Sequence, residues 1–170
     1  SRELKILKIE GTKITNLIPI IYHNGLRYLY CDNIPAPEDK IEAFANQNRE
    51  CLVIYRTREL QSWWNLLDME WKNIFKKHLS AVFTHNEPTE NDNKLIPDKE
   101  DLHKIINLRV INIQLNYDIE ELIPLAMLEK LRNLQISGTR ITELDPLSGL
   151  QELESLDISE NPVSSLEPIV

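Results

Sequence analysis

Apolar residues near the C-terminus recur at unequal steps that fit neither a single amphipathic helix nor a single alternating strand. In residues 131–150 the steps are three, two, three, two, three and three, and residues 153–170 repeat them 22 positions later. The two series are Leu131, Leu134, Ile136, Thr139, Ile141, Leu144 and Leu147, and then Leu153, Leu156, Ile158, Asn161, Val163, Leu166 and Ile169. A fixed period of roughly 20–29 residues with this spacing indicates a solenoid in which each coil is one strand plus a return segment.

The same spacing occurs in two other parts of the chain. Residues 4–20 carry the whole series, residues 26–31 repeat its first part, and residues 108–125 carry it with one extra residue before Ile119. Four coils have a proline just before their last apolar position, namely Pro19, Pro124, Pro146 and Pro168. We therefore predict two blocks of coils whose strands form parallel sheets.

The intervening residues have a helical pattern at first. Residues 35–50 place Ile41, Phe44 and Ala45 on one helical face, with Pro37 in the first turn. Residues 51–55 then predict a third parallel strand. Its inward side chains are either Cys51 and Val53 or Leu52 and Ile54.

Residues 59–80 hold all three tryptophans of the chain. One helical stripe contains Trp64, Leu67, Trp71, Ile74, Phe75 and His78. Asp68 is the expected N-cap of a second helix within this segment. Because a solenoid needs a terminal unit, we interpret the segment as a hydrophobic plug that forms a cap or spacer; a ligand cage or partner-binding helix is the alternative. The predicted domains are residues 1–58, a first block ending in a helix-containing coil; 59–104, the helical cap or spacer and a polar loop; and 105–170, a second block.

The chain resembles bacterial leucine-rich repeat proteins of the internalin-like 22-residue class, whose repeats read approximately LxxLxxLxLxxNxIxxIxPLxxL. The resemblance covers residues 4–34 and 105–170, and residues 29–55 are similar to the helix-containing last coil of some Bacteroidetes-type repeat proteins. Thr12 and Thr139 stand where the family has an asparagine that hydrogen-bonds between coils. The resemblance implies an α/β solenoid, a leucine-rich repeat arc with a parallel β-sheet on its concave face, interrupted here by the Trp-rich helical cap or spacer. It also implies a cell-surface or secreted protein.

Family resemblance further implies that the concave sheet binds a protein partner. Side chains alternate along a strand, so those between the repeated apolar positions point away from the core. The partner-binding residues that we predict on this face are Lys8, Tyr28, Tyr30, Asp32, Asn112, Gln114, Asn133, Gln135 and Asp157. Tyr28 and Tyr30 are the principal candidates, because tyrosine is enriched at binding hot spots. The alternative for these two is that they only cover the sheet beside residues 51–55.

Composition narrows the class of partner. The formal net charge of −8 and the sequence pI near 5.1 argue against nucleic acid or an anionic membrane surface as a partner. No apolar run is long enough for membrane insertion. A protein ligand is therefore expected, with a glycan as a second possibility. The alternative function is a structural spacer or adhesin stalk within a larger surface protein.

Catalytic and metal-binding patterns are missing from the sequence. The four histidines, His23, His78, His85 and His103, show no paired spacing, and there is no G-x-S-x-G or glycine-rich phosphate loop. We take lone histidines as surface or capping residues. The carboxylates of Glu87, Glu90, Asp92 and Asp98 lack the spacing of a calcium loop. We predict a protein that is not an enzyme and has no cofactor or metal.

Two further expectations concern the cysteines and the chain ends. We favour buried thiols for Cys31 and Cys51, with a disulfide as the alternative. The first coil begins at Leu4 without an obvious cap, and the last coil ends in an apolar edge. Because an open solenoid end exposes core residues, we predict either a fragment of a longer array or end-to-end self-association.

Overall fold

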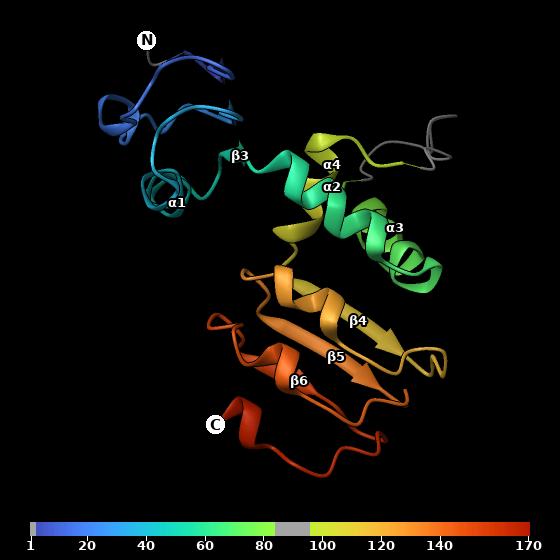
Figure 1. Ribbon diagram of the computed structural model, residues 1–170. Coiled ribbons are helices and arrows are strands. Elements are labelled where there is room, and N and C mark those ends of the chain that lie inside the picture. Colours follow the sequence, from blue (N-terminus) through green and yellow to red (C-terminus); the bar gives the residue numbers. More distant parts are fainter. Residues whose placement is uncertain (1–2, 84–95) are drawn as a thin grey trace. The chain divides into compact units, whose positions relative to one another are not determined.

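The computed structural model describes residues 3–83 and 96–170, and the side chains of all of these except 80–83. The chain forms two compact units, one of Ser1–Trp63 with Pro97–His103 and the other of Trp64–Ile96 with Lys104–Val170. The division falls within two helices, α2 (Thr57–Leu66) and α4 (Lys99–Ile106). Figure 1 traces these elements. The three sequence domains, 1–58, 59–104 and 105–170, stay a prediction.

The first unit contains a three-stranded parallel sheet with the order β1-β2-β3. The strands are β1 (Ile6–Lys8), β2 (Tyr28–Tyr30) and β3 (Leu52–Ile54). Leu7 pairs with Leu29, and Leu29 pairs with Val53, so residues at the same repeat position lie side by side. The short 3-10 helix η1 (Ile18–Ile20) and helix α1 (Glu38–Gln47) form the return segments.

The core of this unit confirms the helix that was predicted after Pro37. Ile41 and Phe44 of α1 are buried, and Phe44 is completely enclosed. The sheet register also decides the phase of the third strand, because Val53 is the partner of the core residue Leu29. Cys51 and Val53 therefore face the core, while Ile54 is buried on the opposite face of the sheet.

Both cysteines are free thiols buried in this core, as we had favoured. Because Leu29 pairs with Val53, Cys31 lies two residues after this pair and Cys51 two residues before it. At about 3.3 Å per strand residue, their Cα atoms are separated by roughly 13 Å along the strands. A disulfide requires Cα atoms within about 7 Å, so the alternative of a bridge is excluded.

The second unit contains another three-stranded parallel sheet, with the order β4-β5-β6. Its strands are β4 (Val110–Gln114), β5 (Asn133–Ser137) and β6 (Ser155–Asp157). The return segments are the 3-10 helices η2 (Ile123–Met127), η3 (Asp145–Leu147) and η4 (Glu167–Ile169), which stack on one another (Figure 1). The second residue of each is one of the regularly placed prolines, whose fixed φ suits the first turn of a helix.

Helix α3 (Met69–Phe83) belongs to the second unit and follows α2 after a two-residue break. The Trp71 N–H donates to Asp68 Oδ1 at 2.8 Å, which confirms Asp68 as the cap that begins α3. Trp64 and Trp71 are buried, and the Trp71 ring lies 5.5 Å from the ring of Phe75. None of the helices in residues 3–83 and 96–170 has the length and hydrophobicity that a membrane-spanning helix needs.

A left-handed residue follows the end of each strand in both units. The positions with positive φ are Gly11, Asn33, Arg56, Leu115, Gly138 and Glu160. The next residue in the coil is the one that stands at the asparagine position of the repeat, as Asn161 does after Glu160. The chain therefore turns out of the sheet in the same way in every coil, including the coil that continues into α2.

Asn161 joins the last two coils through its side-chain amide. Its Oδ1 accepts hydrogen bonds from the Thr139 N–H (3.1 Å), the Thr139 hydroxyl (2.5 Å) and the Ile141 N–H (3.2 Å). Its Nδ2 donates to the carbonyls of Ile136 (2.5 Å) and Ile158 (3.1 Å). Thr139 thus takes part in the ladder of hydrogen bonds between coils, although it replaces an asparagine.

Candidate functional site

The second sheet presents a polar face on the side opposite its core. Asn112 of β4 pairs with Gln135 of β5, and Gln135 pairs with Asp157 of β6. Gln135 Nε2 donates to Asp157 Oδ2 at 3.3 Å, and the Ser159 N–H donates to Asp157 Oδ1 at 2.9 Å. Hydrogen bonds from Ser159 and then Gln135 lower the pKa of the Asp157 carboxyl group, so this row ends in a fixed negative charge.

Further amide side chains on this face are uncommitted. Asn112, Gln114 and Asn133 are exposed, and their side-chain amides have no hydrogen-bond partner among the described residues. Each primary amide can both donate and accept. These amides can therefore form hydrogen bonds with polar groups of a partner, and they do not require the partner surface to carry a charge of one sign.

Paired charges border this face just before β5 and β6. Lys130 Nζ lies 3.2 Å from Glu152 Oε1, and Arg132 lies 3.3 Å from both Glu152 and Glu154. The hydrogen bond from Lys130, reinforced by Arg132, lowers the pKa of the Glu152 carboxyl group. These charges are satisfied within the chain, so the amides remain the main uncommitted groups.

The equivalent face of the first sheet is covered at β2 by a distant segment of the same unit, while Ile6 and Lys8 of β1 are exposed. Tyr30 is only 5% exposed, and its hydroxyl donates to Glu100 Oε1 at 2.5 Å. The ammonium groups of Lys8 and Lys99 each lie 4.8 Å from the centre of the Tyr30 ring. Tyr28 is half-buried and stacks on Tyr30 at 6.3 Å. Burial and then the Glu100 carboxylate raise the pKa of the Tyr30 hydroxyl.

Two more residues, His103 and Asp32, make hydrogen bonds near the ends of the strands of the first sheet. His103 is completely buried, with Nδ1 2.6 Å from the Lys99 carbonyl and Nε2 2.6 Å from the Tyr55 carbonyl and 3.0 Å from the Tyr55 backbone nitrogen. The prediction that lone histidines are surface or capping residues is therefore wrong for His103, which is a core residue. Asp32 accepts the Thr57 N–H at 3.0 Å and its hydroxyl at 2.5 Å. The Asp32 carboxylate is thus engaged at the beginning of α2.

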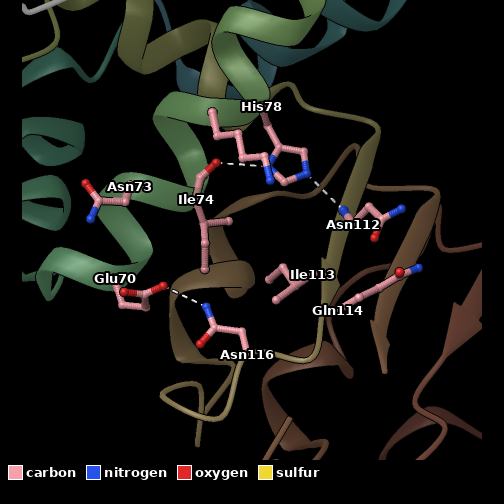
Figure 2. Close-up of a pocket in the computed structure, with 9 residues that line it drawn as sticks. Glu70, Asn73, Ile74, His78, Asn112, Ile113, Gln114 and Asn116 are labelled. Atoms are coloured by element: carbon pink, nitrogen blue, oxygen red, sulfur yellow. Dashed lines mark hydrogen bonds between the residues drawn. The ribbon is translucent and has the colours of Figure 1, made fainter. Parts of the chain in front are cut away.

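A small cavity of about 190 Å³ lies between α3 and β4 in the second unit (Figure 2). The residues that line it are Glu70, Asn73, Ile74, Lys77, His78, Asn112, Ile113, Gln114 and Asn116. Two hydrogen bonds connect its walls: Asn116 Nδ2 donates to Glu70 Oε1 at 2.6 Å, and the Asn112 N–H donates to His78 Nε2 at 2.9 Å. Ile74 and Ile113 lie between these two bonds in Figure 2.

His78 makes hydrogen bonds in this region that sequence reasoning did not single out. Its Nδ1 lies 2.8 Å from the Ile74 carbonyl and must donate there, because Nε2 accepts the Asn112 N–H. The imidazole thus occupies a hydrogen-bonding position at the open edge of β4. The only signal in the sequence was that His78 falls on the same helical stripe as Trp71 and Phe75.

A profile of the family described as Leucine Rich repeats (2 copies) matches residues 129–170. This part of the chain is therefore similar to a pair of leucine-rich repeats. The matched residues contain β5, β6, η3 and η4, so the repeats that were expected from the 22-residue spacing are confirmed in the second unit. No curated protein matches the chain.

The chain is also similar to solved structures of leucine-rich repeat proteins from Listeria monocytogenes strain 4b F2365. One is internalin C2, with 20% identity and a TM-score of 0.38, covering 98% of this chain and 66% of that protein. The other is a second internalin, with 18% identity and a TM-score of 0.35, covering 98% of this chain and 64% of that protein. The chain thus spans slightly less than two thirds of the length of these internalins.

Metal-binding residues do not gather in the described part of this chain. No group of three or more His, Cys, Asp or Glu residues there could hold a metal ion. Of the carboxylates considered for calcium, Asp98 accepts the Asp101 N–H at 2.9 Å at the beginning of α4. Glu87, Glu90 and Asp92, like His85, lie outside the described residues.

Proposed function

We propose that this protein is a non-enzymatic protein-interaction module that binds its partner on the polar face of β4, β5 and β6. One observation carries the proposal: this face holds exposed and uncommitted amides, whereas on the equivalent face of the first sheet Lys99 and Glu100 cover Tyr30 at its centre. Leucine-rich repeats in residues 129–170 support the class of function. The residues that we assign to partner contact on this face are Asn112, Gln114, Asn133, Gln135 and Asp157.

This assignment leaves Lys8, Tyr28, Tyr30 and Asp32 with a different role. Tyr30 contacts Lys99 and Glu100, Asp32 contacts Thr57, and Lys8 and Tyr28 both contact Tyr30. These contacts favour packing and the attachment of helices over direct recognition. A role of Tyr28 and Tyr30 in binding stays a prediction. It would require the segment that covers Tyr30 to move away from the sheet.

A pair of variants tests the proposed face. Asn133 and Ser155 are register partners and both are exposed, so Asn133→Arg with Ser155→Arg places two large cations in the middle of this face. The matched control is Thr142→Arg with Ser164→Arg, which makes the same charge change at two exposed positions outside the strands. Circular dichroism establishes that both variants are folded.

The binding experiment screens displayed proteins and glycans against the natural chain and both variants. We expect a protein partner that is lost with the Asn133 and Ser155 variant and retained with the control. A partner retained by both variants would contradict the assignment of the face. Failure of every candidate to bind would favour the alternative, a structural spacer or adhesin stalk.

We also infer that helix α3, which contains Trp71, caps the second sheet. Two contacts support this role: His78 accepts the Asn112 N–H, and Glu70 accepts from Asn116, which stands at the asparagine position of its coil. A preceding coil would offer hydrogen-bonding groups to the same atoms. His78→Phe keeps a planar ring but removes the acceptor, so we expect faster hydrogen exchange at the Asn112 amide. Unchanged exchange would argue against capping.

The predicted end-to-end self-association stays a prediction. The apolar side chains on which it rests are exposed in the last described coil, with 54% of Leu166 and 37% of Ile169 accessible. Sedimentation velocity over a range of concentrations would test it.

A further inference from the structure

We propose that the groove between α3 and β4 binds the carboxamide side chain of a glutamine supplied by the protein partner. This inference rests on the proposed function, since it names the part of the partner that enters the groove. It begins with the backbone of β4, whose groups alternate between two sides.

One side of β4 pairs with β5. The Arg109 carbonyl accepts from Asn133, and the Leu115 N–H donates to the Ser137 carbonyl. Odd-numbered residues of β4 therefore form the ladder with β5. The Asn112 N–H points the other way, to His78, which places the backbone groups of the even-numbered residues on the side of α3.

This alternation leaves a short row of backbone groups facing the groove. After the Asn112 N–H come the Asn112 carbonyl, the Gln114 N–H and the Gln114 carbonyl. None of these three groups has a hydrogen-bond partner among the described residues. The row offers an acceptor, a donor and an acceptor. A primary carboxamide can accept from the donor at its oxygen and donate from its NH₂ group to one adjacent acceptor, which makes two hydrogen bonds.

The charges and the shape of the groove further restrict the class of ligand that it can bind. Glu70 and Lys77 both line the groove, so its lining carries charges of both signs and favours neither an anion nor a cation, and a neutral polar group meets no like charge there. Buried Ile74 and Ile113 form apolar lining between the two hydrogen bonds of Figure 2, which suits the methylene groups of a glutamine side chain. A cavity of 190 Å³ is smaller than the roughly 300–1,000 Å³ of typical ligand pockets, and therefore fits a side chain.

The probe is the peptide acetyl-Gly-Gln-Gly-amide, titrated into the full chain. Matched peptides carry glutamate or methionine in place of glutamine and keep the same backbone. Chemical shifts of the Leu115 amide and the Asn116 side chain report binding, because both lie beside the groove. Two additional hydrogen bonds should make the glutamine peptide bind about tenfold more tightly than either control.

Proline variants isolate the backbone donor. Gln114→Pro removes the Gln114 N–H, and Val110→Pro removes an equivalent edge N–H outside the groove; neither N–H belongs to the ladder with β5. Gln114→Ala removes only the side chain. We expect Gln114→Pro to weaken the glutamine peptide about tenfold more than Gln114→Ala does, while Val110→Pro binds as the natural chain does.

Equal affinity for the three peptides, no saturable shifts at Leu115 and Asn116, or full binding by Gln114→Pro would each overturn the proposal. If Gln114→Pro does not fold, the comparison of peptides on the natural chain decides the matter alone. A partner that depends on Asn133 and Ser155, together with a groove that binds no peptide, would sustain the proposed function and refute this site. A groove that binds the glutamine peptide, together with a partner that does not depend on Asn133 and Ser155, would sustain this site and refute the proposed function.

Discussion

Replacing Asn161 with alanine removes hydrogen bonds to three buried residues of the preceding coil. Thr139 is 3% exposed, and Ile136 and Ile141 are completely buried, so the groups that lose Asn161 are poorly reached by water. An orphaned buried donor or acceptor costs about 1–3 kcal/mol. Because Asn161 itself is half-buried, water replaces some of these bonds, and we expect a total loss of about 2–4 kcal/mol in the free energy of unfolding.

Thermal unfolding followed by circular dichroism should detect this loss as a decrease of roughly 4–16 °C in Tm. The direct measurement is hydrogen exchange at the Thr139 and Ile141 amides, which should lose protection. Asn133→Ala is the matched control, because it removes an exposed amide without a partner among the described residues. An Asn161→Ala variant with the Tm of this control and unchanged protection at both amides would refute the reasoning.

Three further changes test other parts of the structure. Burial raises the pKa of the Cys31 thiol from 9.0 to about 12, so its contribution to stability is complete below about pH 9 and falls as pH rises towards 12. Alkylation of Cys31 by iodoacetamide at mildly alkaline pH should therefore track unfolding in urea; rapid alkylation of the folded chain would contradict burial. Gly138→Ala should destabilise by about 0.5–1.5 kcal/mol more than Gly11→Ala, since both have φ near +60° but only the former would meet a leucine side chain, at 2.8 Å. Equal denaturation midpoints for the Gly138→Ala and Gly11→Ala variants would contradict this expectation. Tyr30→Phe should lower the free energy of unfolding by about 1 kcal/mol, and adding Glu100→Gln to this variant should lower it little further. If the losses of the two single variants simply add in the double variant, the hydrogen bond between Tyr30 and Glu100 is refuted.

Much of the fold was predictable because repeat spacing is a local property of the sequence. The 22-residue offset predicted which residues become register partners, as Asn133 and Ser155 do. The regular prolines marked the 3-10 helices, and Asp68 marked the beginning of α3. In each case the signal and the structure lie within one coil or one helical turn.

Contacts between distant residues could not be predicted in the same way. Tyr30 meets Glu100 across 70 residues, and no periodicity connects the two positions. For the same reason, the exposed face of the second sheet could not be distinguished from the covered face of the first. The single histidines gave no paired spacing, although His103 and His78 both make specific hydrogen bonds to strand backbones.

The regular register of β5 and β6 means that a whole coil can be deleted or added in protein engineering. Excision of residues 131–152 would bring Leu153 to the place of Leu131, and each later side chain would keep its side of the sheet. Removing one residue within a strand would instead reverse every side chain beyond it. This chain has one extra residue between Gln114 and Ile119, in a turn where the added length does not disturb the hydrogen-bond ladder between β4 and β5. Coil number is therefore a quantity that can be varied without redesigning the core.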